Sequence, residues 1–405
     1  MCRRVASGFD LVSADNFAVF AKLRVLNLKK IIIHAGFHKT GTTALQHSLH
    51  ASSELLKASG YRYPIVDQGT SQSGSVLALA NRGWGWQARG SKVLPKRIWA
   101  KLVKITRSGN DNIVLSSEFF SELDEVHVRQ VKAAFEGLNV QVVFTMRALD
   151  KVFPSTYQQG LKSGSAYSYE VWLERTVNDY FAEQKTGFWK RNRHAHVISR
   201  WMDIFGAENV TVITADESNP GLLFERFGEL LKLPAGTLKP VAESGLNRSL
   251  LLDEIHLLRA INKNVPKSRN WNAYMTFIRR GTFEQITATP VGKVTASARL
   301  RTPKAYAKKI EQIAALEMAE LKSLNLRVMG SLSDLEVGTA PIGPNAEITE
   351  ISIDKVAAVI ASYDFGLLKL ISPKAMLKNW IPYFENRLPN FVYRPISALI
   401  KLVAK

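Results

Sequence analysis

The sequence predicts a three-layer α/β fold, in which a parallel β-sheet is flanked by helices on both faces and followed by a helical C-terminal part. Short β-branched runs alternate with segments of helical periodicity before about residue 220. These runs are apolar along most of their length, which is typical of strands buried on both faces. A chain of 405 residues, 46% of them hydrophobic, is long enough to bury such a core.

The elements follow in order along the chain. The strands are expected at residues 30–35, 112–117, 140–146 and 209–214. The helices are expected at residues 42–50, 122–136, from about 149, 189–204, 250–261 and 306–324. In the helix at 122–136 we expect Val126, Val131 and Phe135 at apolar positions, and beyond residue 220 the strand signals fade.

Composition shifts divide the chain into three parts. Residues 1–29 are a short amphipathic lead-in, and residues 30–330 form the predicted main domain. Glycines and prolines near residue 340 indicate a linker, which makes residues 331–405 a linker and a basic, aromatic C-terminal extension. Such an extension fits peripheral contact with an anionic membrane surface.

Charge and cysteine content restrict the classes of function. The net charge of +19 creates a positive field that attracts polyanions, but no zinc-finger, RRM or helix-turn-helix signature accompanies it, so nucleic acid is not an expected partner. The single cysteine, Cys2, allows neither an intrachain disulfide nor a cysteine zinc cage. Because we also expect no cleaved signal and no membrane span, the predicted location is the cytoplasm, with possible association at the inner membrane surface.

A glycine-rich turn, Gly36-Phe-His-Lys-Thr-Gly-Thr-Thr, joins the first predicted strand to the N-terminus of a helix. Unpaired N–H groups and the helix dipole favour an anion at such a junction, so the turn predicts a phosphate-binding loop, or P-loop. In the form typical of nucleotide hydrolases, a lysine follows the second glycine. Here Thr42 takes that place, and Lys39 lies inside the loop.

With Lys39 in that position, the segment from His34 to Gln46 resembles the 5′-phosphosulfate loop of sulfotransferases that use 3′-phosphoadenosine 5′-phosphosulfate (PAPS). The core Lys-Thr-Gly-Thr-Thr is typical of that family, in its bacterial and carbohydrate-type members. The resemblance implies a P-loop-type fold and PAPS as co-substrate, with no metal expected. It also implies donor contacts from Gly36, Phe37, His38, Lys39, Thr40, Gly41, Thr42 and Thr43.

Two further groups of residues match the family pattern for donor binding. Arg147 follows the third strand and Ser155 comes eight positions later, the spacing at which sulfotransferases bind the 3′-phosphate of the donor. A strand's carboxyl end is also where open α/β sheets bind ligands. Asn247 and Ser249 resemble an Asn-x-Ser motif of bacterial members and imply a third contact.

Transfer of a sulfuryl group requires a cation that stabilises the leaving phosphate and a base that accepts the acceptor's proton. Lys39 is the predicted cation. Glu118, at the end of the second strand, is the predicted base, as in carbohydrate-type members, and His38 is the alternative. We interpret His34 as a histidine that either packs in the core or braces the loop.

The expected activity is transfer of a sulfuryl group from PAPS to a hydroxyl or amine of a carbohydrate, glycolipid or other small-molecule acceptor. Trp84 and Trp86, in a glycine-rich connection, are candidates for stacking against the acceptor. One alternative is a P-loop kinase or nucleotide hydrolase, which Thr42 disfavours. The other is a non-catalytic protein that binds an acidic glycan or lipid through its basic surface.

Overall fold

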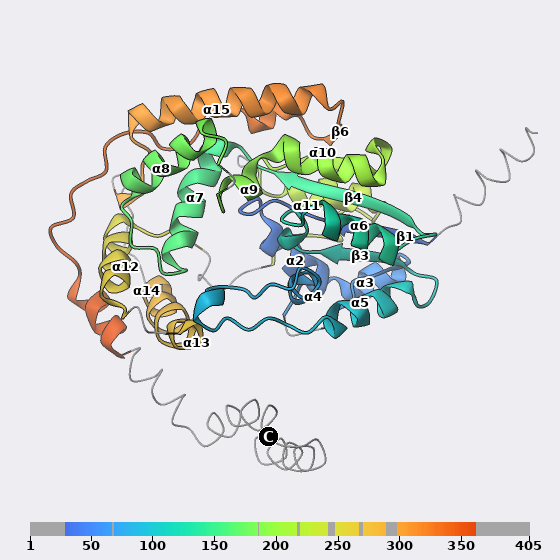
Figure 1. Ribbon diagram of the computed structural model, residues 1–405, viewed down its shortest axis with the longest axis horizontal. Helices are drawn as coiled ribbons and strands as arrows, with labels where there is room; N and C mark the ends of the chain where they lie inside the picture. Colours follow the sequence, from blue (N-terminus) through green and yellow to red (C-terminus); the bar gives the residue numbers. More distant parts are fainter. Residues whose placement is uncertain are drawn as a thin grey trace, which may run out of the picture.

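A sheet of six parallel strands, in the order β2-β3-β1-β4-β5-β6, forms the centre of the fold (Figure 1). The strands are β1 (Lys30–His34), β2 (Tyr61–Arg62), β3 (Asn112–Ser116), β4 (Asn139–Met146), β5 (Val210–Thr214) and β6 (Arg327–Met329). The computed structural model describes residues 29–66, 69–184, 186–216, 219–241, 248–266, 270–288 and 298–361.

The predicted α/β class and the four predicted strands are confirmed, as β1, β3, β4 and β5. The two outer strands, β2 and β6, were not predicted because they have only two and three residues. The strand signals were expected to fade beyond about residue 220, and β6 is the short strand that lies in this region. Edge strands are shielded on fewer sides, so their sequences lack the continuous apolar run that marks a central strand.

Alternation along β1 assigns its side chains to the two layers of helices. Ile31 and Ile33 belong to one buried cluster, whereas Ile32 belongs to the other. All three side chains are completely buried. The apolar run at the start of the main domain thus becomes a strand with helices on both faces.

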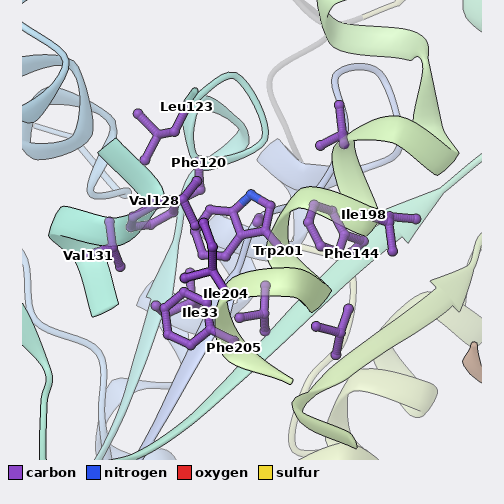
Figure 2. Close-up of a cluster of buried hydrophobic side chains, with 14 of the residues drawn as sticks. Ile33, Phe120, Leu123, Val128, Val131, Phe144, Ile198, Trp201, Ile204 and Phe205 are labelled. Atoms are coloured by element: carbon purple, nitrogen blue, oxygen red, sulfur yellow. The ribbon is translucent and has the colours of Figure 1, made fainter. Parts of the chain in front are cut away.

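The helices that cover the Ile31 and Ile33 face of the sheet form the first layer. Trp201 lies at the centre of the buried cluster between this layer and the sheet, as Figure 2 shows. Trp201 is on α10 (His194–Phe205), and its ring makes edge contacts with Phe120 and Phe144. The residues labelled around it come from β1, β4, α6 and α10, together with the turn after β3. This cluster joins the sheet to the helices that the sequence predicted between strands.

The helix expected at 122–136 is shorter, since α6 spans Glu125–Ala134. Asp124 caps it by accepting a hydrogen bond from His127 N at 3.0 Å. Val131 and Phe135 are buried, but Val126 is 63% exposed. Val126 therefore does not share the buried face of α6 with Val131, although the sequence placed both among the apolar positions of the helix.

The second layer is formed by α2 (Thr42–Ala51), α3 (Ser53–Ala58) and α11 (Leu222–Leu230). Two further helices, α4 (Ser73–Leu79) and α5 (Arg97–Arg107), lie in the connection between β2 and β3. The helix expected at 189–204 is divided at Arg193 into α9 (Trp189–Asn192) and α10.

A separate buried cluster, seen beside the sheet in Figure 1, combines α7 and α8 with the helical part that was predicted after about residue 220. Its helices are α7 (Leu149–Leu161), α8 (Tyr169–Phe181), α12 (Leu252–Asn264), α13 (Trp271–Tyr274), the π-helix η5 (Met275–Phe283), α14 (Glu284–Ala288) and α15 (Lys304–Ser323). The long helix α15 contacts α7 and α8 as well as α10, so it joins this part to the sheet.

The described residues of the predicted extension lie against the domain. Asp334 accepts hydrogen bonds from Thr214 and Arg226, and Asp150 accepts hydrogen bonds from the main chain of residues 338 and 340. Residues 1–28 and 362–405 lie outside the described residues. Within the part of the chain that the structure describes, no helix is both long and apolar enough to cross a membrane.

Candidate active site

The phosphate loop lies between β1 and α2, and Gly36 sits where a side chain has no room. A Cβ there would lie 2.5 Å from His34 Nε2 and 2.7 Å from Thr42 Oγ1, and closer still to Thr145 Oγ1. At the other end of the loop, Gly41 has a φ of 86°, in the left-handed region that favours glycine. Gly36 is thus required by the side chains packed around it, and Gly41 by its backbone conformation.

Several side chains of the loop point into the fold. The Thr40 hydroxyl donates to Phe37 O at 2.6 Å and lies 2.8 Å from Thr145 Oγ1, and the Thr42 hydroxyl donates to Phe37 O at 3.3 Å. Phe37 is completely buried, with its ring 4.3 Å from that of His194. Phe37 and Thr40 therefore shape the loop and leave their main chain as the part that a ligand could contact.

His34 braces the loop from below, as the sequence predicted. Its Nδ1 lies 2.7 Å from Ser116 Oγ and its Nε2 lies 3.1 Å from Thr145 Oγ1, so the ring links β1 to both neighbouring strands. Burial lowers the pKa of His34 to about 3. The imidazole is therefore neutral and serves as a fixed hydrogen-bonding bridge.

A cavity of about 910 Å³ opens above the loop, at the edge of the sheet where β1, β3 and β4 end. The structure brings nine of the predicted site residues to its wall: His38, Lys39, Gly41, Thr42, Thr43, Glu118, Arg147, Ser155 and Ser249. Gly36, Phe37 and Thr40 lie behind this wall, and Asn247 lies outside the described residues. The parallel sheet explains this convergence, since its strands end at one edge.

Lys39 and Arg147 are in direct contact, because Arg147 Nη1 donates to Lys39 O at 3.1 Å. Lys39 has a φ of 67°, which is unusual for a residue with a side chain. Burial, Arg147 and Arg279 lower the pKa of the Lys39 ammonium, while Glu118 acts in the opposite direction. Such repulsion between neighbouring cations is relieved when an anion binds between them.

Two more cations, Lys162 and Arg279, belong to this group. Burial lowers the pKa of Lys162 to about 7, and the charges of Lys39, Arg279 and Arg248 act in the same direction. Arg279 donates to Lys162 O at 3.1 Å. The Arg-Arg-Gly triplet at 279–281 gave a weak sequence signal for Arg279, but nothing marks Lys162, which follows the last residue of α7.

Glu118 begins a short 3₁₀ turn directly after β3. Its Oε2 lies 3.3 Å from Gln46 Nε2, and the same amide nitrogen donates to Ser116 O at 3.3 Å. Gln46 is buried on α2, so it fixes the carboxylate from below. The carboxylate lies in the same cavity as Lys39, as a base and a leaving-group cation would require.

His38, the alternative base, is held by a residue that the sequence did not point to. Its Nε2 lies 2.6 Å from Glu122 Oε1, and Arg82 and Arg191 also approach the Glu122 carboxylate. These residues are far apart in the sequence and follow no regular spacing. His38 lies in the phosphate loop, Arg82 follows α4, Glu122 lies in the turn after β3, and Arg191 is on α9. Their pairing depends on the tertiary fold.

The two tryptophans of the glycine-rich connection have different environments. Trp86 packs against Tyr274 with ring centroids 4.5 Å apart, and its Nε1 donates to Ser163 O. Trp84 is 41% exposed, lines the cavity and lies 4.7 Å below the guanidinium of Arg279. Only Trp84 therefore offers an indole to a molecule in the cavity.

Near the predicted third donor contact, Arg248 and Ser249 differ in environment. Arg248 forms a two-point ion pair with the completely buried Glu254, at 2.7 and 2.8 Å. This pair fixes the start of α12. Ser249 is exposed and lines the cavity, so it is the member of the motif that the structure brings to the site.

No protein-family model matches the sequence, and no curated protein matches it. Among solved structures, the chain is similar to the crystal structure of a sulfotransferase from Alicyclobacillus acidocaldarius, with a TM-score of 0.43 and 12% sequence identity. The match covers 76% of this chain and 98% of that chain. A likeness at this level carries no argument about activity.

The fold and the cavity together define an α/β protein with a cavity rich in cationic side chains at the carboxyl edge of its sheet. Among the described residues the cavity is lined by one carboxylate, that of Glu118, and by six cations: Lys39, Arg82, Arg147, Lys162, Arg191 and Arg279. The described residues contain no group of three or more His, Cys, Asp or Glu side chains that could hold a metal ion.

Proposed function

We propose that the protein is a sulfotransferase that moves a sulfuryl group from PAPS to a hydroxyl or amine of a carbohydrate or glycolipid acceptor. The observation that carries this proposal is the meeting of Lys39, Glu118 and Arg147 in one cavity, each from the end of a different strand. The donor carries a 5′-phosphosulfate and a 3′-phosphate, so it needs two anion sites. The phosphate loop and the pair Arg147 and Ser155 supply them.

In the proposed reaction, an acceptor oxygen or nitrogen forms a bond to sulfur while the bond from sulfur to the bridging oxygen breaks. The acceptor's proton passes to Glu118, and the Lys39 ammonium stabilises the negative charge that develops on the leaving 3′-phosphoadenosine 5′-phosphate (PAP). Gln46 keeps the carboxylate in place. The buried, mutually repelling cations favour an anionic ligand, in agreement with such a donor.

Calorimetric titration with PAP and with ATP, both without magnesium, tests the donor assignment. The wild-type protein is expected to prefer PAP, and Lys39→Ala is expected to weaken PAP binding about 10- to 100-fold, the value of one charge-assisted contact. Lys57→Ala removes the same charge from an exposed position on α3 and should have no such effect. Equal affinity for the two nucleotides, or no binding of either, would contradict the proposal.

A further inference from the structure

A second group of charges lies next to the phosphate loop; three of its members line the same cavity, and the fourth, Glu122, does not. It consists of His38, Arg82, Glu122 and Arg191, and is called here the Glu122 cluster. Glu122 Oε1 lies 2.6 Å from His38 Nε2 and 3.6 Å from Arg191 Nε, and Glu122 Oε2 lies 2.5 Å from Arg82 Nη2. The Glu122 side chain is only 5% exposed, so all three partners converge on a buried carboxylate.

The Glu122 cluster carries more positive than negative charge. Burial alone would raise the pKa of Glu122, but the hydrogen bond from His38 and the charges of His38, Arg191 and Arg82 outweigh it and lower that pKa to about 2. Glu122 is therefore ionised at neutral pH and neutralises one guanidinium. With two arginines in the cluster, at least one positive charge remains uncompensated within it.

Of the residues in the Glu122 cluster, Arg191 has the guanidinium best able to bind a ligand. Its distance of 3.6 Å from the carboxylate is too long for a hydrogen bond. Its side chain is 38% exposed and lines the cavity. Among the described residues it has no side-chain hydrogen bond, so its guanidinium can still form a two-point contact with an oxyanion.

Apart from His38, which also belongs to the phosphate loop, the Glu122 cluster does not overlap with the residues assigned to the donor. The pKa of Lys39 responds to Arg147, Arg279 and Glu118, and that of Lys162 responds to Lys39, Arg279 and Arg248. Neither of these groups shares a member with the cluster around Glu122. The cavity therefore has two positive poles, of which the proposed donor contacts use one.

We propose that the acceptor is an anionic saccharide, whose carboxylate or sulfate group binds Arg191 and Arg82 while a sugar ring lies against Trp84. This inference rests on the proposed function. A guanidinium matches the geometry of an oxyanion through two parallel hydrogen bonds, and an exposed indole offers a flat apolar face. A neutral sugar would leave the excess positive charge of the Glu122 cluster unpaired.

Binding of a matched pair of probes to the full chain, saturated with PAP, tests this assignment. One probe is an oligosaccharide of alternating glucuronate and N-acetylglucosamine, and the other is a neutral N-acetylglucosamine oligosaccharide of the same length. The wild-type protein is expected to bind the acidic probe at least about tenfold more tightly, as one charge-assisted contact predicts. Arg191→Gln should remove most of that preference and leave the affinity for the neutral probe unchanged.

Lys190→Gln is the matched control, because it removes the same charge from the exposed neighbouring position. It should keep the preference, which separates a specific contact from the general attraction of a basic protein. Arg191→Lys is the second variant, since it keeps the charge and loses the planar fork, and it should keep part of the preference. Arg82→Gln should act in the same direction as Arg191→Gln.

The outcomes separate this inference from the proposed function. If PAP binds normally but both probes bind equally, or the preference survives Arg191→Gln, the anionic acceptor is wrong and the donor assignment stands. If Arg191→Gln weakens PAP binding as strongly as Lys39→Ala does, the second pole belongs to the donor and the inference is overturned. If the wild-type protein does not bind PAP at all, the proposed function and this inference fail together.

Discussion

The guanidinium of Arg147 donates a hydrogen bond to the main-chain oxygen of Lys39, although Arg147 follows β4 and Lys39 lies in the loop after β1. The contact joins β4 to the phosphate loop that follows β1. Since Lys39 adopts a left-handed backbone conformation, this hydrogen bond helps to hold the loop in a shape that costs free energy. Arg147 therefore has two predicted roles: it stabilises the phosphate loop, and it binds the 3′-phosphate of the donor.

Replacement of Arg147 by alanine should weaken PAP binding about 10- to 100-fold, because a charge-assisted contact with the 3′-phosphate is lost. The loss should depend on that phosphate. Calorimetry should show that wild type prefers PAP to adenosine 5′-phosphate, and that the variant binds the two with similar affinity. Arg129→Ala, on the exposed face of α6, is the control. A variant that still prefers PAP would remove Arg147 from the 3′-phosphate site.

Glu118→Gln should keep PAP affinity and lower the rate of transfer by about 10²- to 10⁴-fold, because the amide cannot accept the acceptor's proton. The amide is close in shape to the carboxylate and can still accept the hydrogen bond from Gln46. The measurement is transfer of labelled sulfuryl groups to the acidic saccharide probe, with His38→Gln assayed in parallel. Full turnover by Glu118→Gln, together with loss of turnover in His38→Gln, would assign the base to His38.

Lys162 should make the free energy of unfolding depend on pH. Its pKa is about 7 in the folded protein against an ordinary value of 10.5, so between these values the unfolded state binds more protons. Stability should therefore rise as the pH increases through this window, with a contribution of at most about 1.4 kcal/mol per pH unit. Urea unfolding at several pH values should show a smaller slope for Lys162→Met than for wild type. Identical slopes would contradict the assignment.

Donor binding should raise the lowered pKa of Lys162, because an anion near Lys162 stabilises its charged form. At about one pH unit above the pKa of Lys162, PAP binding should be accompanied by proton uptake. Calorimetry in two buffers of different ionisation enthalpy measures this uptake directly. Lys162→Met should reduce it, and an unchanged uptake in the variant would assign the proton to another group, such as Lys39.

Gly36→Ala should destabilise the protein by about 1 to 3 kcal/mol, because the new methyl group would collide with His34, Thr42 and Thr145 in a closely packed site. Gly228→Ala is the control, since a methyl group there meets nothing within 4 Å and lies on α11. That change should stabilise the helix by about 0.5 to 1 kcal/mol. Thermal and urea unfolding of both variants should therefore give effects of opposite sign.

The central strands were predictable because burial on both faces demands a continuous apolar sequence, as in β1 and β5. The break at Arg193 between α9 and α10 was not predictable, since no glycine or proline marks it. The same limit applies to β2 and β6, whose pairing comes from the neighbouring strand rather than from their own residues.

The candidate site likewise contains some residues that the sequence could place and others that it could not. Lys39, Glu118 and Arg147 each follow a predicted strand, so parallel pairing alone was enough to place them at one edge. Lys162 and Arg191 reach the cavity through the packing of helices, which no local spacing encodes. The proposed roles of these five residues, in catalysis, donor binding or acceptor binding, are predictions.

The sheet also has a consequence for synthesis on the ribosome. The strand β6 pairs with β5 through Val212 and Val328, yet the helices α11 to α15 separate them along the chain. A nascent chain therefore presents the unpaired edge of β5 until Arg327–Met329 has been synthesised. Such open edges recruit strands of other chains. Premature termination before β6 should yield a product prone to aggregation, whereas the full sheet covers this edge itself.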